Sequence, residues 1–197
     1  IDPLDGTNNF LNGLDYYSVC IALAHRGKIC LGLVYRPSNG DCYFAEENKK
    51  AGLSNLKTLT RKKTIKRDDL SLKNGKKISD CLLVTGFSAK KGQPLKKEFE
   101  KFACLLQKCR GIRRMGSAAL DLCLVAEGKL DAFWEVGLSP WDVAAPSLIC
   151  QQVGLFIGTY GGERFDAFAK ESLLVTPNNL KKELINIAQE TKKHYKV

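Results

Sequence analysis

The chain has few residues of the types that build several common kinds of functional site. Its 197 residues include only two histidines, His25 and His194, which are far apart and show no ligand spacing. None of its eight cysteines forms a C-x-x-C pair, so the paired spacing of a zinc site is missing. A disulfide-stabilised domain would be shorter and denser in cysteine. We therefore predict reduced thiols and a cytoplasmic protein.

Long apolar runs are also absent, and so is a secretory signal. A membrane-spanning helix needs about 20 mostly apolar residues, so we expect no membrane segment. The chain does not begin with methionine, and we expect it to be the C-terminal part of a longer protein. Its 44% of hydrophobic residues are sufficient for a core and one or two small domains.

The charge balance is strongly basic, with 31 Lys and Arg against 21 Asp and Glu and a net charge of +10. A basic chain can bind nucleic acid. Sites for single-stranded nucleic acid interleave aromatic with basic side chains, but residues 52–83, the most lysine-rich stretch, contain no aromatic residue. We therefore favour a solvated basic surface and keep RNA or a transcription complex as an alternative partner.

The first ten residues contain the most informative group of side chains. Asp2 and Asp5 lie three positions apart, and Gly6 and Thr7 follow directly. Hard cations prefer oxygen ligands, so both carboxylates and the carbonyl of Leu4 are candidate metal ligands. Gly6 and Thr7 predict the beginning of a short helix, where free N–H groups can hold a phosphate. Asp-Pro and Asp-Gly are also ordinary turn dipeptides, so this segment alone leaves both interpretations open.

The pattern of apolar residues predicts an antiparallel meander followed by alternating helices and strands. Asn39-Gly40 is the best hairpin signal of the meander, and Ser117 is a natural helix N-cap. We predict strands at 17–24, 29–35, 41–45, 56–59, 81–85, 112–115, 130–136, 155–158 and 173–176, and helices at 94–108, 118–127, 143–152 and 180–195. This order favours an α/β (α+β) layered architecture.

Four segments in order resemble the inositol monophosphatase family of magnesium-dependent, lithium-sensitive phosphatases. Residues 2–10 read D-P-L-D-G-T-N-N-F, and residues 141–149 read W-D-V-A-A-P-S-L-I. Residues 111–122 and 131–138 also look like family segments. Four ordered segments are far more specific than any one short motif. The resemblance runs from Asp2 to about residue 179.

The resemblance implies a layered αβαβα sandwich of the inositol monophosphatase and fructose-1,6-bisphosphatase type, here lacking its first helices. We expect residues 1–77 to be the remainder of an N-terminal α+β subdomain. Residues 78–197 would form a C-terminal α/β subdomain. Family members are often dimers, so we also expect a homodimer.

The resemblance also assigns roles to the motif residues. It implies two Mg²⁺ ions, held by the oxygens of Asp2, Leu4 (carbonyl), Asp5 and Asp142. Asp2 would bridge the ions, and Thr7 would orient the nucleophilic water through its hydroxyl, so Asp2, Asp5 and Thr7 are the expected catalytic residues. The N–H groups of Gly6 and Thr7 would hold the phosphate. Without the resemblance, Asp142 would be interpreted as a helix cap.

The second half of the chain is expected to determine substrate specificity. Gly116, Ser117 and Ala118 lie at the family's polyol-contacting segment, and Asp142 borders the same site. Glu135 matches a family glutamate that binds an inositol hydroxyl, although an exposed acid at a strand end is the simpler interpretation. The resemblance thus favours inositol-1-phosphate or a related polyol or sugar phosphate. Alternatives are a fructose-1,6-bisphosphatase, a histidinol phosphatase, a 3′-phosphonucleotidase, or a non-catalytic role in binding RNA or a transcription complex.

The sequence departs from the family pattern at several points. Asn8 replaces a usual Thr, Ser or Arg, and about ten residues around 67–77 look inserted. Residues 151–155 read Q-Q-V-G-L, where the family usually continues toward E-A-G-G. The family's upstream metal-binding glutamate does not occur in these residues, so we expect the chain alone to be catalytically impaired. An inactive relative would have no physical reason to keep three converging carboxylates, which argues against degeneracy.

Overall fold

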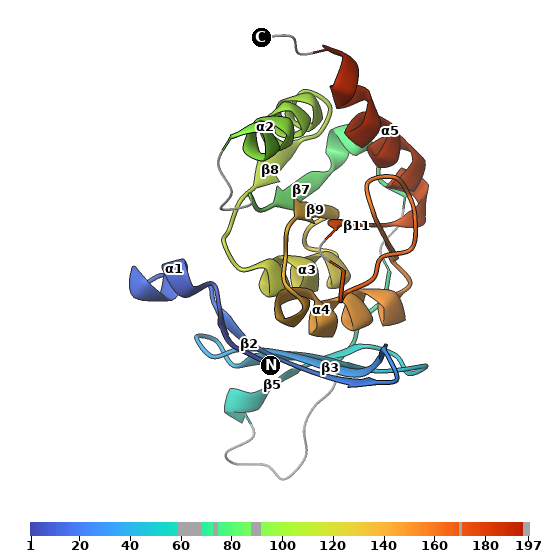
Figure 1. The fold of residues 1–197 in the computed structure, drawn as a ribbon. Coiled ribbons are helices and arrows are strands. Elements are labelled where there is room, and N and C mark those ends of the chain that lie inside the picture. Colours follow the sequence, from blue (N-terminus) through green and yellow to red (C-terminus); the bar gives the residue numbers. More distant parts are fainter. Residues whose placement is uncertain (59–67, 73–74, 88–91, 170, 195–197) are drawn as a thin grey trace.

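The computed structural model describes residues 1–58, 68–72, 75–87, 92–169 and 171–194. In these residues the chain forms two sheets and five α-helices. Figure 1 shows four layers: a first sheet, the helices α3 and α4, a second sheet, and the helices α2 and α5. Of the basic segment predicted as an insertion around 67–77, residues 67, 73 and 74 lie outside the described residues.

The first sheet is the predicted antiparallel meander, with six strands in chain order. Its strands are β1 (Asp2–Asp5), β2 (Ser18–His25), β3 (Lys28–Arg36), β4 (Asp41–Glu46), β5 (Gly52–Asn55) and β6 (Asp68–Asp69). The short helix α1 (Thr7–Leu11) separates β1 from β2. The prediction of three strands between residues 17 and 45 is therefore confirmed.

The strand predicted at 56–59 is wrong. Residues Leu56–Thr58 form the 3₁₀ turn η1, and the strand of this region, β5, ends at Asn55. The side-chain oxygen of Asn55 accepts a hydrogen bond from the N–H of Lys57 at 3.1 Å. Local bonds of this kind give the backbone an alternative to a sheet ladder, and here they end the strand.

Helices α3 (Ala118–Ala126) and α4 (Pro140–Val153) lie between the two sheets (Figure 1). Helix α4 packs on β2, β3 and β4 and also against α3. A Cβ atom on Gly32 of β3 would lie 2.6 Å from the carbonyl oxygen of Ala145, so glycine permits the close approach of strand and helix. Val34, Ile149 and Phe133 belong to one buried cluster that joins both sheets through this layer.

The second sheet is mixed, with the strand order β10-β11-β9-β7-β8 and parallel pairing only for β9-β7 and β7-β8. Its strands are β7 (Leu82–Thr85), β8 (Gly111–Arg113), β9 (Ala132–Val136), β10 (Phe156–Gly158) and β11 (Ser172–Thr176). The 3₁₀ turn η2 (Ile78–Asp80) precedes β7. Helices α2 (Gln93–Leu106) and α5 (Asn178–His194) cover the outer face of this sheet.

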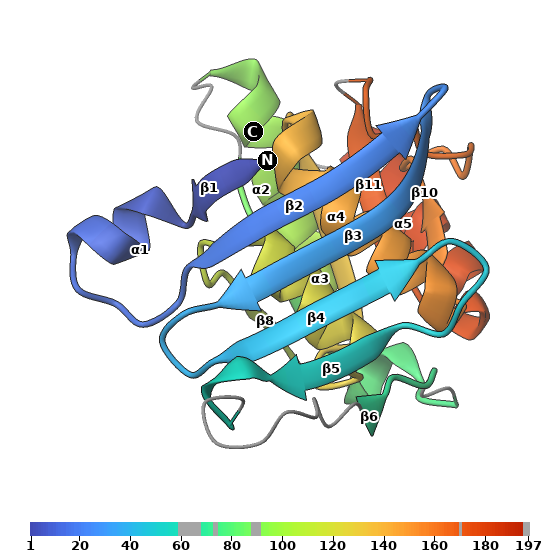
Figure 2. The ribbon, with the colours of Figure 1, turned by 90° about the horizontal axis from the view of Figure 1, so that it is seen from below.

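The outer face of the first sheet is the one seen in Figure 2, and none of the described helices covers it. Ile21, Leu23 and Leu31 on these strands are between 40% and 58% exposed. The α/β (α+β) class is confirmed, with the layers in the order β-α-β-α. The subdomain boundary at residues 77/78 stays a prediction. No helix among the described residues is long and apolar enough to cross a membrane.

Candidate metal and phosphate site

Three carboxylates from distant parts of the sequence meet at one edge of the first sheet. Asp2 and Asp5 stand at the two ends of β1, and Asp142 lies in the first turn of α4. One carboxylate oxygen of each residue lies within 4.8 Å of those of the other two. The fold thus places together the acids of the first and last family-like motifs.

Asp5 is held firmly through one of its oxygens. Its Oδ2 accepts hydrogen bonds from the hydroxyl of Ser117, from the N–H of Ala119 at 3.0 Å and from the hydroxyl of Ser18 at 3.4 Å. Burial raises the pKa of Asp5, the bonds from Ser117 and Ala119 lower it, and the charge of Asp2 raises it. With Oδ2 fixed in this way, Oδ1 remains as the ligand atom of a carboxylate that cannot rotate freely.

Asp142 is a helix cap, and its cap uses only one of the two carboxylate oxygens. The N–H of Ser139 donates to Asp142 Oδ2 at 2.8 Å, which completes a capping box. This cap makes α4 begin at Pro140, three residues before the predicted position 143. Burial raises the pKa of Asp142 to about 6; the bond from Ser139 lowers it, and the charges of Asp5 and Asp2 raise it further.

The residues between and after the first two acids form a compact turn. Leu4 N–H donates to Asp2 Oδ1 at 3.0 Å, and the hydroxyl of Thr7 donates to the carbonyl of Leu4 at 3.0 Å. Gly6 is the N-cap of α1 with φ +87, a conformation that favours glycine. The predicted short helix therefore begins at Thr7. The first N–H groups of a helix have no intrahelical partner, so they remain available to a phosphate.

Glu135 lies near the end of β9, where its carboxylate is half-buried rather than exposed. A Cβ atom on Gly86 would collide with this carboxylate, so the glycine makes room for it. Burial raises the pKa of Glu135 to about 8; the charge of Asp121 also raises it, and that of Arg114 lowers it. An acid in this environment differs from the exposed strand-end acid that the sequence also allowed.

The expected polyol-contacting segment, Gly116 to Ala118, lies at the beginning of α3. Ser117 is fully buried and caps α3, because its oxygen accepts from the N–H of Leu120 at 3.4 Å. Its hydroxyl donates to Asp5, so the side chain is turned to the carboxylate cluster. Gly116 and Ala118 are partly exposed. A substrate would therefore meet the backbone of this segment or these two neighbours rather than the Ser117 hydroxyl.

The sequence analysis missed a group of polar residues that supports the site. The hydroxyl of Tyr16 donates to Asp121 at 2.7 Å, and the amide of Asn9 donates to the carbonyls of Tyr16 and Met115 at 2.7 and 2.8 Å. These bonds hold the segment after the first motif against α3. Asp121 is 1% exposed, and burial raises its pKa to about 7. A single acid inside the apolar run A-A-L-D-L-C-L-V-A was the available signal.

The sequence pattern of the “Inositol monophosphatase family” matches residues 1–193. The chain belongs to this family.

Curated relatives include the “Nus factor SuhB” of Pasteurella multocida, 34% identical over 96% of this chain and 66% of that protein. The “Inositol-1-monophosphatase” of Caulobacter vibrioides is 34% identical over 94% of this chain and 68% of that protein. Among solved structures, “Mycobacterium tuberculosis SuhB” has a TM-score of 0.82 at 30% identity, covering 96% of this chain and 71% of that one. The chain spans about two thirds of the length of these relatives.

The carboxylate cluster of this inositol monophosphatase family member fits a divalent cation. Its donors are all oxygens, which suits Mg²⁺, and the family is generally Mg²⁺-dependent. The pKa values of Asp5 and Asp142 are raised partly by the other negative charges around them. A cation among the three acids would remove that repulsion, so these three residues fit a metal ion.

Proposed function

We propose that this chain is the main part of a Mg²⁺-dependent phosphomonoesterase that hydrolyses inositol-1-phosphate or a related polyol or sugar phosphate. The observation that carries the proposal is the cluster of Asp2, Asp5 and Asp142, whose ligand oxygens lie within 4.8 Å of one another beside the start of α1. Such a cluster can hold metal ions, and the helix start next to it can hold the phosphate.

Each residue has a role that follows from its contacts. When bound, two Mg²⁺ ions supply positive charge against the phosphoryl group and activate a water. Asp2, Asp5, Asp142 and the Leu4 carbonyl would hold them. The hydroxyl of Thr7, which donates to Leu4, would orient the attacking water, and the N–H groups of Gly6 and Thr7 would bind the phosphate. Lithium inhibition would follow from competition at the same ligands.

The substrate's alcohol part would lie between the beginning of α3 and Glu135. The raised pKa of Glu135 leaves much of this carboxyl protonated near neutral pH, so it can donate as well as accept a hydrogen bond to a polyol hydroxyl. A phosphatase specific for inositol-1-phosphate is our first choice. Fructose-1,6-bisphosphate, histidinol phosphate and 3′-phosphonucleotides are the alternatives that the assay must separate.

Phosphate release with and without Mg²⁺ tests the proposal, using these four substrates. The decisive variant is Asp142→Asn, because the amide oxygen can still accept from Ser139 while the ligand charge is lost. We expect the rate of phosphate release to fall at least about 100-fold, which is more than the usual loss for a residue that only orients a metal ligand. Asp80→Asn, an exposed acid on η2, is the matched control and should keep full activity.

The assay is made on this chain and on the protein with any residues that precede Ile1. Release that needs neither Mg²⁺ nor Asp142 would refute the two-metal proposal. Preference for another of the four substrates would keep the chemistry and change the specificity. A chain that gains activity only with its preceding residues would agree with the expected contribution of an upstream glutamate.

Several curated relatives carry the name “Nus factor SuhB”, and this favours a second candidate function. We propose a binding role in a transcription complex, mediated by the basic surface, as the alternative to catalysis. RNA binding that weakens steeply with salt and is unchanged in Asp142→Asn would support it. A homodimer, also proposed, can be tested in the same preparations by light scattering.

A further inference from the structure

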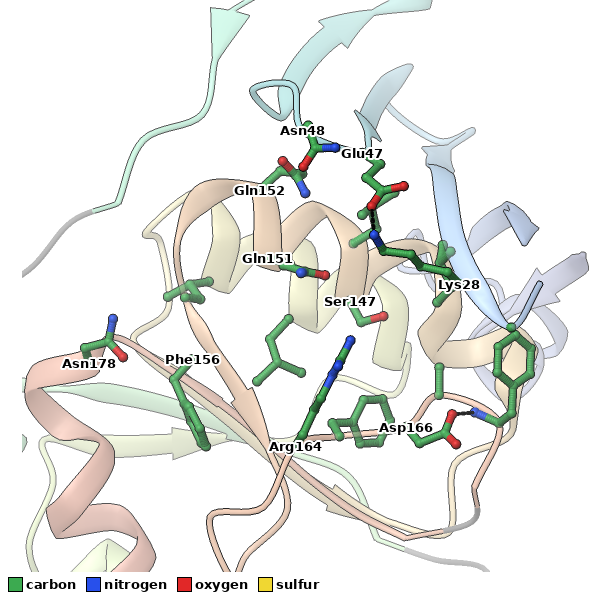
Figure 3. A pocket seen from close by; sticks show the side chains of 18 residues that line it. Lys28, Glu47, Asn48, Ser147, Gln151, Gln152, Phe156, Arg164, Asp166 and Asn178 are labelled. Carbon is green, nitrogen blue, oxygen red and sulfur yellow. Dashed lines mark hydrogen bonds and ion pairs between the residues drawn. The ribbon is translucent and has the colours of Figure 1, made fainter. Parts of the chain in front are cut away.

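A cavity of about 860 Å³ lies at the other end of helix α4 from the three carboxylates, and Figure 3 shows it from close by. Asp142 is in the first turn of α4, whereas Gln151 is nine residues further along, about 13 Å along the helix axis. The cavity is lined by none of the residues assigned above to metal, phosphate or substrate. Its volume is typical of pockets for small molecules.

Segments that are distant in sequence build the walls of this cavity. The second half of α4, the turn between β2 and β3, the turn between β4 and β5, and the loop after β10 all contribute. Asn178, the first residue of α5, lies at its edge. The walls therefore combine helix α4, two turns of the first sheet and part of the longer loop between β10 and β11, and they meet only in the folded chain.

One cationic group in the cavity lacks a partner. Lys28 and Glu47 at the rim form an ion pair with each other, as drawn in Figure 3. The carboxylate of Asp166 accepts a hydrogen bond from the N–H of Phe168 at 2.9 Å, which is a contact within its own loop. Arg164 points into the cavity in Figure 3, and its guanidinium makes no hydrogen bond or ion pair with any residue that the structure describes. Arg164 is exposed, so its guanidinium is solvated, and an anion can pair with it without breaking an existing ion pair.

The α4 wall opposite this guanidinium carries no negative charge. Gln151 and Gln152 line it, and they belong to the segment 151–155 in which the sequence departs from the glutamate-containing family pattern. Amide side chains offer both donors and acceptors, whereas a glutamate here would repel an anion. The departure therefore changes the charge of this cavity, although it lies away from the carboxylate cluster.

The cavity also has an apolar part. Leu155 and Phe165 belong to its lining, and both also belong to or pack against the buried cluster between the two sheets. Apolar walls with a few convergent polar groups are the usual composition of a small-molecule site. A ligand that fits both parts has an anionic group for the arginine and an apolar or planar body for Leu155 and Phe165.

We propose that this cavity is a binding site for a small organic anion, distinct from the metal site. The carboxylate or phosphate of the ligand would form a bidentate pair with Arg164, since the planar guanidinium matches both groups. Gln151 and Gln152 hydrogen-bond its remaining oxygens, and its body packs on Leu155 and Phe165.

Three probes with one common ring test the proposal: benzoate, phenylphosphonate and the neutral benzamide. Each is titrated into the 197-residue chain in the presence of a chelator, and amide chemical shifts are followed by NMR. We expect benzoate or phenylphosphonate to bind saturably and to shift the signals of Gln151, Gln152 and Phe165. The tighter of the two anions identifies the ligand's head group as carboxylate or phosphate. Benzamide should bind at least about tenfold more weakly.

Two variants locate the charge. Arg164→Gln keeps hydrogen-bonding capacity but loses the cation, and Gln152→Glu adds a repelling carboxylate; each should weaken anion binding about tenfold or more. Arg110→Gln, an exposed arginine elsewhere on the surface, is the matched control and should bind like the parent chain. Equal binding of benzamide, no effect of Arg164→Gln, absence of saturable binding, or shifts confined to Asp5 and Asp142 would each overturn the proposal.

The outcome is independent of the phosphatase proposal. Anion binding should persist with Mg²⁺ removed and in Asp142→Asn, because this residue lies at the other end of α4. A chain that loses phosphatase activity in Asp142→Asn but keeps benzoate binding would separate the two sites. Loss of anion binding in Asp142→Asn would contradict the proposed anion site and leave the phosphatase proposal unaffected.

Discussion

Replacing Ser117 by alanine is a sharp test of how this site is built. The Ser117 hydroxyl caps α3 by accepting from Leu120 N–H at 3.4 Å and donates to Oδ2 of Asp5. The variant Ser117→Ala removes both contacts without adding volume. Ser117 is fully buried, so water cannot easily replace the lost hydroxyl.

The substitution has two separable effects, one on the stability of the fold and one on metal binding. Losing an N-cap costs about 1 kcal/mol, and losing a hydrogen bond to a carboxylate costs about 1.5–3 kcal/mol. Together they should lower the melting temperature by about 5–15 °C, at about 2–4 °C per kcal/mol for a chain of this size. The effect on metal binding is separate, because Asp5 would keep only the bonds from Ala119 and Ser18. The pKa of Asp5 would also rise, since the lost bond from Ser117 lowers it. Residues that orient a metal ligand typically contribute 10–100-fold to affinity.

We therefore expect Mg²⁺ affinity to fall at least about tenfold in Ser117→Ala, measured by isothermal titration calorimetry at a temperature where the variant is folded. Ser147→Ala is the matched control. Ser147 is also a buried helical serine, but its hydroxyl donates only to the carbonyl of Ala144 in its own helix. A variant with unchanged Mg²⁺ affinity and a lower melting temperature would show that Ser117 is only a helix cap, and the reasoning would fail.

Two further predictions concern stability. The pKa of Asp121 is raised to about 7, so the folded chain binds more protons than the unfolded chain between about pH 4 and pH 7. The free energy of unfolding therefore falls as the pH rises through that window, by up to about 1.4 kcal/mol per pH unit. Asp121→Asn should flatten this part of the curve of melting temperature against pH, and parallel curves would refute the assignment. Gly32→Ala should cost about 1–3 kcal/mol in denaturant unfolding, because its Cβ would lie 2.6 Å from the Ala145 carbonyl oxygen. Gly111→Ala, whose Cβ would meet nothing closer than 3.6 Å, should cost less, and an equal loss for both would contradict the packing argument.

Much of the fold could be predicted because its signals are local. The alternation of apolar residues predicted β2, β3 and β4, and the N-cap Ser117 predicted the beginning of α3 at the correct residue. Errors occurred where a side chain overrides the local pattern. The side chain of Asn55 ends β5 at the point where a strand was expected to begin, at residues 56–59, and the capping box of Ser139 moves the beginning of α4 to Pro140.

The sequence by itself determined which carboxylates to consider and which family the chain belongs to, because the motifs and their order are read directly along the chain. It could not determine how each carboxylate is held. The bond from Ser117 to Asp5 joins residues 112 apart, and the one from Tyr16 to Asp121 joins residues 105 apart. Contacts of this range exist only after both sheets have packed on α3 and α4. The same is true of the cavity around Arg164, whose walls become neighbours only in the folded chain. Local patterns therefore specified the elements and the candidate ligands, and long-range packing decided their orientation, burial and pKa.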